Sequence, residues 1–294
     1  MEFFLELLVN GLLVGMMYAL VALSFVLIYK ATSVINFAQG ELVMFGGFVT
    51  SALLTLYGMP LVLALPSALG VMIGFGFALE RGMLRPLLGR PVIGIIMATV
   101  GLASVLRGLA PMLWGAATKA VPLPLPIRPL VVFDLYISPV NLAAAGASMV
   151  FLAGFGYFFK KTRTGIAMRA VADDQQAAMS VGIHVGWIFA LTWGIAGLVS
   201  AIGGVIWGNF LGVDTHLALV GLKVFPVVIL GGMDSILGAI LGGLIVGAAE
   251  NVSAGFIDPY VGGGTKDFMP YVLMIFALMI RPAGFFGQEM IERV

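Results

Sequence analysis

The segment GLLVGMMYALVALSFVLIYKATSVINFAQGELVMFGGF, residues 11–48, decides the class of fold. It carries no charged residue as far as Tyr29, which is long enough to cross a bilayer, since a membrane helix takes about 20 apolar residues. Asn36, Gln39 and Glu41 then interrupt the apolar sequence before it resumes. Polar and ionisable groups are costly inside a membrane. The segment therefore predicts two membrane helices joined by a polar stretch that has a role of its own.

Composition extends this interpretation to the whole chain. Of its 294 residues, 61% are hydrophobic and only 10% are charged, against about 25% in soluble domains, and its mean hydropathy is +1.11. We expect an all-α, polytopic membrane protein with a single transmembrane domain, residues 1–294. A net charge of +1 gives no field to attract nucleic acid, and the lack of cysteine excludes disulfides and thiolate-bound metals. Glu2 and Glu6 precede the first apolar run, which is too long for a signal peptide, so we expect it to remain as the first span.

Apolar runs predict roughly eight to ten membrane helices, some of them short or re-entrant. The segment 216–235 is the least regular, because Lys223 and Pro226 interrupt it, and it crosses the membrane either fully or only in part. The expected helices occupy residues 7–29, 37–57, 61–79, 92–113, 139–159, 187–211, 216–230, 236–254 and 268–281.

Lysine and arginine set the expected orientation, because they concentrate in cytoplasmic loops. The basic connection before residue 92 and the connection 160–186 are placed in the cytoplasm with the C-terminus, and the N-terminus is placed outside. The segment 114–138 then faces outward, and its prolines favour a stiff, extended connector over a docking site. The basic residues are Arg81, Arg85, Arg90, Lys160, Lys161, Arg163 and Arg169.

Small residues recur at every fourth position in two of the expected helices. Such rows let helix backbones approach closely. Packing within the subunit is the simpler interpretation, and a symmetric contact at a pore or between two subunits stays open. The first row is Ala196, Ser200, Gly204, Gly208 and Gly212, and the second is Ser235, Ala239, Gly243 and Gly247.

The polar stretch is expected at the cytoplasmic start of the second helix. Asn36 is placed to cap that helix. Glu41 falls in the first turn, where the helix dipole favours a negative charge by about 0.3–1 kcal/mol. Neither argument explains Gln39, so we predict that the stretch shapes the inner gate of a path for a hydrophilic solute.

Three further polar residues stand in the expected spans. Arg107 lies past the middle of its helix, and it either extends outward to the membrane surface or pairs with a carboxylate of a neighbouring helix or a passing solute. Asn209 is placed to donate to a neighbouring backbone. Glu250 lies toward the outer end of its helix, where an interfacial position is expected.

The connection 160–186 predicts a partly amphipathic cytoplasmic helix with Asp173 and Asp174 in its middle. Such a helix either covers the base of this protein or docks in the groove of a partner, and the residues alone do not decide between the two.

No motif predicts catalysis or a resident cofactor. The sequence at 262–267 lacks the spacing of a phosphate loop, and His184 and His216 lack metal-ligand spacing. We expect no enzyme and no metal site in this chain.

Three segments resemble one family, the permease subunits of ABC importers for branched-chain amino acids. They are residues 11–48 quoted above, RTGIAMRAVADDQQAAMSVGIHV at 163–185, and GLKVFPVVILGGMDSILGAILGGLIVGAAE at 221–250. The resemblance covers most of the chain and keeps the order of the motifs.

The resemblance implies a multi-pass protein of the cell inner membrane that works by alternating access. Its implied partners are a homologous second permease, two ATPase subunits that bind ATP and magnesium, and a periplasmic or lipid-anchored substrate-binding protein. It also favours docking of the 160–186 loop on the ATPase, through Gly165, Arg169, Asp173, Asp174 and Gly182. Candidate residues of the translocation path are Asn36, Gln39, Glu41, Arg107, Asn209 and Glu250.

Other functions remain open on the sequence. Related permeases carry amides or urea. An ion-coupled secondary transporter would need carboxylates near the middle of the membrane, of which the chain offers few. A membrane scaffold and an intramembrane enzyme are further alternatives.

Overall fold

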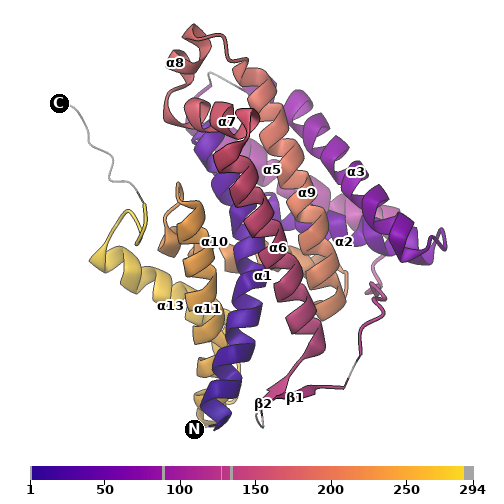
Figure 1. The fold of residues 1–294 in the computed structure, drawn as a ribbon. Helices are drawn as coiled ribbons and strands as arrows, with labels where there is room; N and C mark the ends of the chain where they lie inside the picture. The colour runs from indigo at the N-terminus through magenta and orange to yellow at the C-terminus, as the bar shows by residue number, and fades with distance from the viewer. Residues whose placement is uncertain (1, 88–89, 127, 133–134, 288–294) are drawn as a thin grey trace. The chain divides into compact units, whose positions relative to one another are not determined.

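The computed structural model describes residues 2–87, 90–126, 128–132 and 135–287. It is built from helices, with one small hairpin (Figure 1). The elements are α1 (Glu2–Thr32), α2 (Gln39–Thr55), α3 (Leu61–Leu79), the π-helix η1 (Glu80–Leu84), α4 (Arg85–Leu87), α5 (Val92–Trp114), β1 (Leu130–Val132), β2 (Leu135–Ile137), α6 (Pro139–Lys161), α7 (Arg163–Asp173), α8 (Gln175–Ser180), α9 (Val185–Leu211), the 3-10 helix η2 (Thr215–Ala218), α10 (Leu219–Gly231), α11 (Ile236–Phe256), α12 (Asp258–Val261) and α13 (Thr265–Ile280).

The predicted all-α polytopic class is confirmed, but the number of full-length spans is lower than expected. Among the described residues, six helices are long and apolar enough to cross a membrane: α1, α3 with its continuation to Leu87, α5, α6, α9 and α11. Three other apolar helices are short, with 17 residues in α2, 13 in α10 and 16 in α13. For α10, the expected range 216–230 was longer than the helix because apolar residues continue through the 3-10 helix η2 that precedes it.

The chain divides into two compact units, which are described separately. Unit 1 comprises Met1–Val26, Pro124–Val150 and Leu222–Val294, and unit 2 comprises Leu27–Leu123 and Phe151–Gly221.

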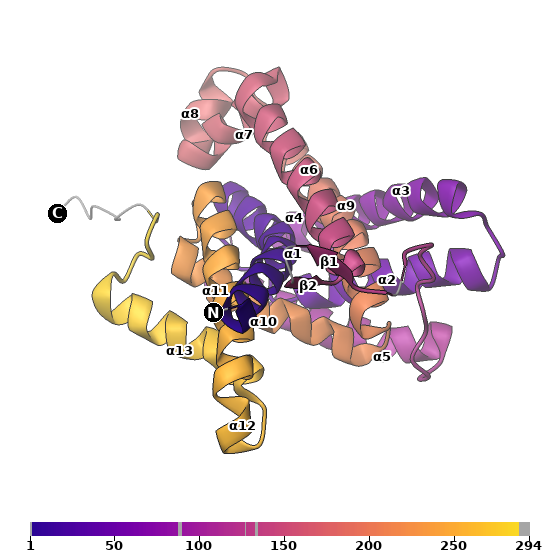
Figure 2. The ribbon, with the colours of Figure 1, turned by 60° about the horizontal axis from the view of Figure 1, so that its bottom comes forward.

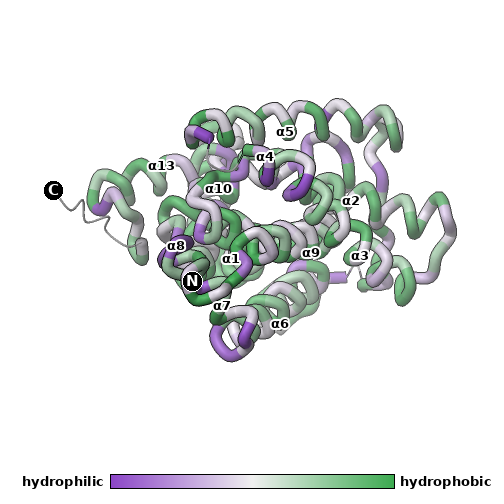
Figure 3. The backbone as a smooth tube through the Cα atoms, turned by 90° about the horizontal axis from the view of Figure 1, so that it is seen from above, coloured by the Kyte–Doolittle hydropathy of each residue, from purple (hydrophilic) through white to green (hydrophobic). Residues whose placement is uncertain are grey.

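In unit 2, α9 is the central helix, and α2 and α3 lie directly against it. A Cβ atom on Gly46 of α2 would meet the Ser200 carbonyl oxygen at 2.5 Å, and one on Gly204 of α9 would meet the Val43 carbonyl oxygen at the same distance. These backbones touch because no side chain separates them. As a result α2 is buried around most of its surface, whereas α5 is largely exposed and, in the hydropathy colouring of Figure 3, mostly hydrophobic.

The first row of small residues ends beyond its helix. Gly208 lies against Val213, at 2.6 Å from an added Cβ, but Gly212 follows the last residue of α9 and caps it with φ +83°. Glycine adopts this left-handed conformation without strain. Gly212 therefore ends the helix rather than packing against another one, which corrects the helix-packing role expected for it.

In unit 1, the second row packs α11 against α1. A Cβ atom on Gly15 would meet the Gly243 carbonyl oxygen at 2.6 Å, and one on Gly247 would meet the Gly11 carbonyl oxygen at 2.5 Å. Beyond α11 the chain makes the short helix α12 (Figure 2), where the Asp258 carboxylate accepts hydrogen bonds from the side chain and backbone of Thr265. Both bonds hold the pKa of the Asp258 carboxyl below its usual value, and the bond from the hydroxyl contributes more than the bond from the N–H.

The connector 114–138 is more structured than the expected extended chain. In unit 1, β1 and β2 form an antiparallel hairpin that pairs Val131 with Tyr136. In unit 2, Lys119 and Val213 exchange two backbone hydrogen bonds of 2.9 and 2.8 Å. The connector is thus pinned to the segment after α9.

Adding one methyl group at Gly204 tests the contact between α2 and α9. We expect Gly204→Ala to lower the stability of the purified protein by about 1–3 kcal/mol, because the new Cβ meets backbone atoms that cannot move aside. The control is Gly101→Ala in α5, where an added Cβ meets nothing within 4 Å. The control should keep or slightly raise the thermal unfolding temperature in detergent. Equal unfolding temperatures for the two variants would contradict the packing argument.

Candidate functional site

The polar stretch forms a break between α1 and α2, in which residues 33–38 are not helical. The backbone groups of the break bond to polar side chains. Phe37 N–H donates to Thr99 Oγ1 at 3.3 Å, and Ala38 N–H donates to Asn36 Oδ1 at 3.1 Å. Such pairing is what allows irregular backbone at membrane depth.

The expected capping role of Asn36 is corrected in detail. The N-cap residue of α2 is Ala38, which has no side-chain acceptor. Asn36 lies two residues earlier, where its oxygen closes a local turn onto Ala38 N–H and its amide nitrogen donates to Gln39 Oε1 at 3.3 Å. It therefore stabilises the turn that leads into the helix.

The sequence had suggested that the second helix begins at the level of the connections expected in the cytoplasm, but its neighbours place its start elsewhere. Gln39, fully buried, donates to Ser200 Oγ at 2.8 Å, and Ser200 lies near the middle of α9. Glu41 contacts Arg107, which lies roughly 10 Å from the Trp114 end of α5 at 1.5 Å per residue. Both neighbours show that α2 begins deep along the length of two membrane-length helices.

Arg107 forms an ion pair with Glu41, through Nη2 and Oε1. Arg107 thus pairs with a carboxylate from a neighbouring helix, which was one of the two alternatives that the sequence left open. The two partners differ in exposure, with 50% of the Arg107 side chain accessible but only 3% of the Glu41 side chain. Glu41 is in the first turn of α2, as expected.

Asn209 and Glu250 are held by contacts within their own units. In unit 2, Asn209 Nδ2 donates to the Val121 carbonyl at 2.8 Å and so anchors the connector after α5. In unit 1, Glu250 is buried within the protein. Tyr18 donates to its Oε2 at 2.9 Å, and its Oε1 has no hydrogen-bond partner among the described residues.

The connection 160–186 holds two short helices instead of one. The helix is interrupted at Asp174, which lies between α7 and α8. Its carboxylate accepts hydrogen bonds from the N–H groups of Gln176 and Ala177 at 2.8 and 2.9 Å and so caps α8. The sequence missed this break because an aspartate inside an alanine-rich segment fits a helix interior and an N-cap alike.

The other predicted residues of this connection shape its two ends. Gly165 N–H bonds to the Thr162 hydroxyl that caps α7, and Gly182 turns the chain after α8 with φ +86°. Arg169 lies over the ring of Phe159 at 5.9 Å. Asp173 is exposed at the end of α7. Figure 1 shows α7 and α8 at the end of unit 2 where α9 begins.

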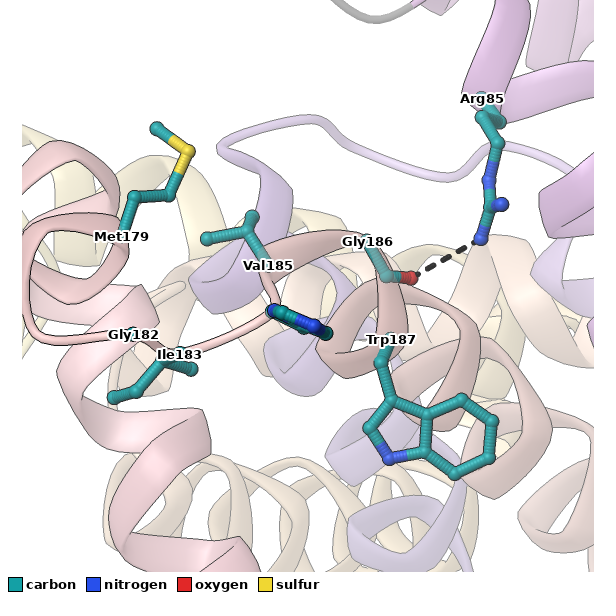
Figure 4. A pocket seen from close by; sticks show the side chains of 8 residues that line it. Arg85, Met179, Gly182, Ile183, Val185, Gly186 and Trp187 are labelled. Atoms are coloured by element: carbon teal, nitrogen blue, oxygen red, sulfur yellow. Dashed lines mark hydrogen bonds between the residues drawn. The ribbon is translucent and has the colours of Figure 1, made fainter.

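An open pocket of about 640 Å³ lies beside α8 and the start of α9. Figure 4 shows its lining, in which Arg85 points at the Gly186 carbonyl and donates to it at 3.3 Å. Arg85 also makes two bonds, of 3.1 and 3.2 Å, to the buried carboxylate of Glu80. The lining residues are Arg85, Met179, Gly182, Ile183, His184, Val185, Gly186 and Trp187.

The contact between Glu80 and Arg85 was not foreseen from the sequence. Residues five apart do not share a face of an α-helix, on which neighbours are three or four apart. In the π-helix η1 the Arg85 N–H bonds to the Glu80 carbonyl, and this wider turn brings the two side chains together. The only signal in the sequence was a glutamate and an arginine at an unfavourable spacing.

The fold and site define a multi-pass helical membrane protein whose second helix starts from a polar break, with a folded connection after α6. Comparison with known proteins identifies the class. Residues 7–278 match the family described as "Branched-chain amino acid transport system / permease component". The chain belongs to this family, so it is a membrane permease and not an enzyme, as the sequence predicted.

Relatives of similar length support the assignment. The chain is 32% identical to the high-affinity branched-chain amino acid transport system permease protein BraD of Pseudomonas aeruginosa, over 99% of this chain and 98% of that protein. It is 29% identical to LivH of Escherichia coli K12, with the same coverage. It is 28% identical to a probable LivH of Methanocaldococcus jannaschii, over 92% of this chain and 88% of that protein.

A matched pair of serine variants tests the polar break. Ser200 and Ser148 are both fully buried and both bond to a carbonyl of their own helix, but Ser200 also accepts from Gln39. We expect Ser200→Ala to cost about 1–3 kcal/mol of stability, because the buried Gln39 amide loses its acceptor, and Ser148→Ala to cost much less. Thermal unfolding of the purified variants measures the difference. A Ser148→Ala variant as unstable as Ser200→Ala would contradict this role for Gln39.

Proposed function

We propose that this chain is the permease subunit of an ATP-driven ABC importer for branched-chain or other aliphatic amino acids. The observation that carries the proposal is the family match over residues 7–278, together with full-length similarity to permeases named for branched-chain amino acid transport. The mechanism is alternating access: hydrolysis of ATP in other subunits changes the relative stability of two conformations, and the helices open a path first to one side and then to the other.

The proposed assembly contains a second, homologous permease, two ATPase subunits that bind ATP and magnesium, and an external substrate-binding protein. Membership of the importer family supports this composition. The chain lies in the cell inner membrane, with its N-terminus outside and its C-terminus in the cytoplasm, as the basic connections indicate.

The connection 160–186 is the proposed docking surface for an ATPase subunit. The fold of α7 and α8 supports this role, because it presents polar and apolar groups together. Asp173 and Asp174 are exposed, and so are the large apolar side chains of Val181 and of two residues that line the pocket, Met179 and Trp187. Exposed apolar side chains rimmed by polar ones mark interaction surfaces.

The break before α2 is the proposed polar part of the translocation path, formed by Asn36, Gln39, Glu41 and Arg107. Broken helices deep in the membrane commonly form the binding sites of transporters. The hydrogen bonds of Gln39 and the ion pair of Glu41 support the assignment, since both residues bond to membrane-length helices at positions away from the helix ends. Asn209 and Glu250 are left to packing roles, because each bonds to a neighbouring segment of its own unit.

Reconstitution of the importer tests the proposed function. Proteoliposomes that contain this chain with its companion permease, ATPases and binding protein should accumulate leucine only when ATP is supplied. The control replaces the ATPases with a variant unable to hydrolyse ATP, and uptake should disappear. Uphill leucine uptake by this chain alone, driven by a proton or sodium gradient, would show a secondary transporter instead.

Two substitutions at Asp174 test the docking surface. We expect Asp174→Ala to reduce substrate-stimulated ATP hydrolysis by the assembled importer severalfold, because α8 loses the cap worth about 0.5–2 kcal/mol. Asp174→Asn keeps a side-chain acceptor and should keep most of the stimulation. Both variants should still insert in the membrane. If Asp174→Ala stimulates normally, the shape of α8 does not matter for coupling.

A further inference from the structure

The pair of Glu41 and Arg107 combines two charges that membrane helices normally exclude. Removing both charges from water is costly, so such a pair adds little net stability compared with apolar side chains of the same size. Ionisable residues on membrane helices are therefore functional candidates. The pair joins α2 to α5 within unit 2, next to the break in the backbone.

The contact leaves binding capacity on the arginine. It joins Nη2 of Arg107 to Oε1 of Glu41, whereas a guanidinium carries five N–H donors in a planar fork that matches a carboxylate. Half of the Arg107 side chain stays exposed. The guanidinium therefore has donors to offer to a second carboxylate.

An aromatic cluster continues from the ion pair along the same two helices. Phe45 and Phe48 follow Glu41 by four and seven residues, which keeps them on one face of α2. Trp114 follows Arg107 by seven residues on α5, and its ring lies 5.3 Å from that of Phe45 and 5.2 Å from that of Phe48. The facing surfaces of α2 and α5 thus carry opposite charges first and aromatic rings roughly 6–10 Å further along the helix axis.

From this arrangement we propose that Glu41 and Arg107 form the recognition site for the zwitterionic head of an α-amino acid. The pair is closed in this structure and opens when α2 and α5 separate during transport. The substrate carboxylate then binds the Arg107 guanidinium, its ammonium group binds the Glu41 carboxylate, and its aliphatic side chain lies toward Phe45 and Trp114. The inference rests on the proposed transport of amino acids and identifies the residues that recognise the substrate.

Charge balance gives this site its selectivity. A zwitterion replaces one ion pair by two, so neither Glu41 nor Arg107 is left without a partner in a medium of low dielectric constant. A neutral amide or urea cannot compensate either charge when the pair opens. An anion would leave the buried Glu41 unpaired, which carries a strong penalty, and a cation would leave Arg107 without its partner.

Neutralising both residues separates recognition from structure. Glu41→Gln and Arg107→Gln are made singly and together in the assembled importer, and leucine uptake is measured in proteoliposomes with the binding protein and ATP. Each single variant leaves an unpaired charge and should lose stability as well as uptake. The double variant removes both charges, so its thermal unfolding temperature and its copurification with the partner subunits should recover. Its initial rate of leucine uptake should stay at least tenfold below that of the unmodified importer.

A charge pair in unit 1 that has no buried partner serves as the control. Lys223 Nζ lies 2.7 Å from Asp267 Oδ1, and the double variant Lys223→Gln with Asp267→Asn should keep leucine uptake within about twofold. Recovery of uptake in the Glu41 and Arg107 double variant would overturn the proposal, because a purely structural pair is dispensable once both charges are gone. An equal loss of uptake in the control would overturn it as well. If the unmodified importer takes up no amino acid, the proposed function itself fails, and that result is separate from the other two.

Discussion

A backbone that leaves its helix inside a membrane must find partners for its N–H and C=O groups within the protein. The break between α1 and α2 meets this requirement, and much of unit 2 is arranged around it. Thr99 from α5 and Asn36 from the break itself accept the N–H groups of Phe37 and Ala38. Gln39 ties the first residue of α2 to Ser200 in α9. The polar residues that looked misplaced in the sequence are those that make the break possible.

The glycines of α2 and α9 follow from the same constraint. A helix that starts deep in the protein is surrounded on most sides, so it must pack without bulky side chains on the contact face. Gly46 and Gly204 provide this, since an added Cβ atom at either would meet the opposing backbone. Close backbone contact also fixes the height of α2 along α9, which in turn sets Glu41 opposite Arg107. Packing and electrostatics are thus linked: the ion pair depends on where the small residues let the helices cross.

Sequence patterns predicted the features that depend on local composition. The apolar runs located the spans, the small-residue rows located close helix contacts, and the unusual position of Glu41 and Arg107 singled out both residues. The depth of the α2 start was not predictable, because hydropathy measures the length of an apolar run and not where it begins in space. The partners of the ion pair are 66 residues apart in the sequence, and no periodicity connects them. The bond between Glu80 and Arg85 was hidden for a different reason, since it depends on a π-helical turn that α-helical spacing does not predict.

The central position of α9 links the two ends of the proposed mechanism. Near its first turn, Arg85 donates hydrogen bonds to the Gly186 carbonyl and to the Glu80 carboxylate. It so joins α9 to the segment after α3, beside the connection proposed to dock an ATPase. Near its middle, Ser200 holds Gln39 at the start of α2. Because α9 is one continuous helix of 27 residues, buried along most of its length, a tilt imposed at its first turn would also displace its middle in the proposed mechanism. Such a displacement would shift Glu41 relative to Arg107, because α2 contacts α9 backbone to backbone whereas the ion pair joins α5 to α2 through side chains. In the proposed mechanism, the separation of the ion pair that substrate recognition needs would thus follow from movement at the proposed docking surface.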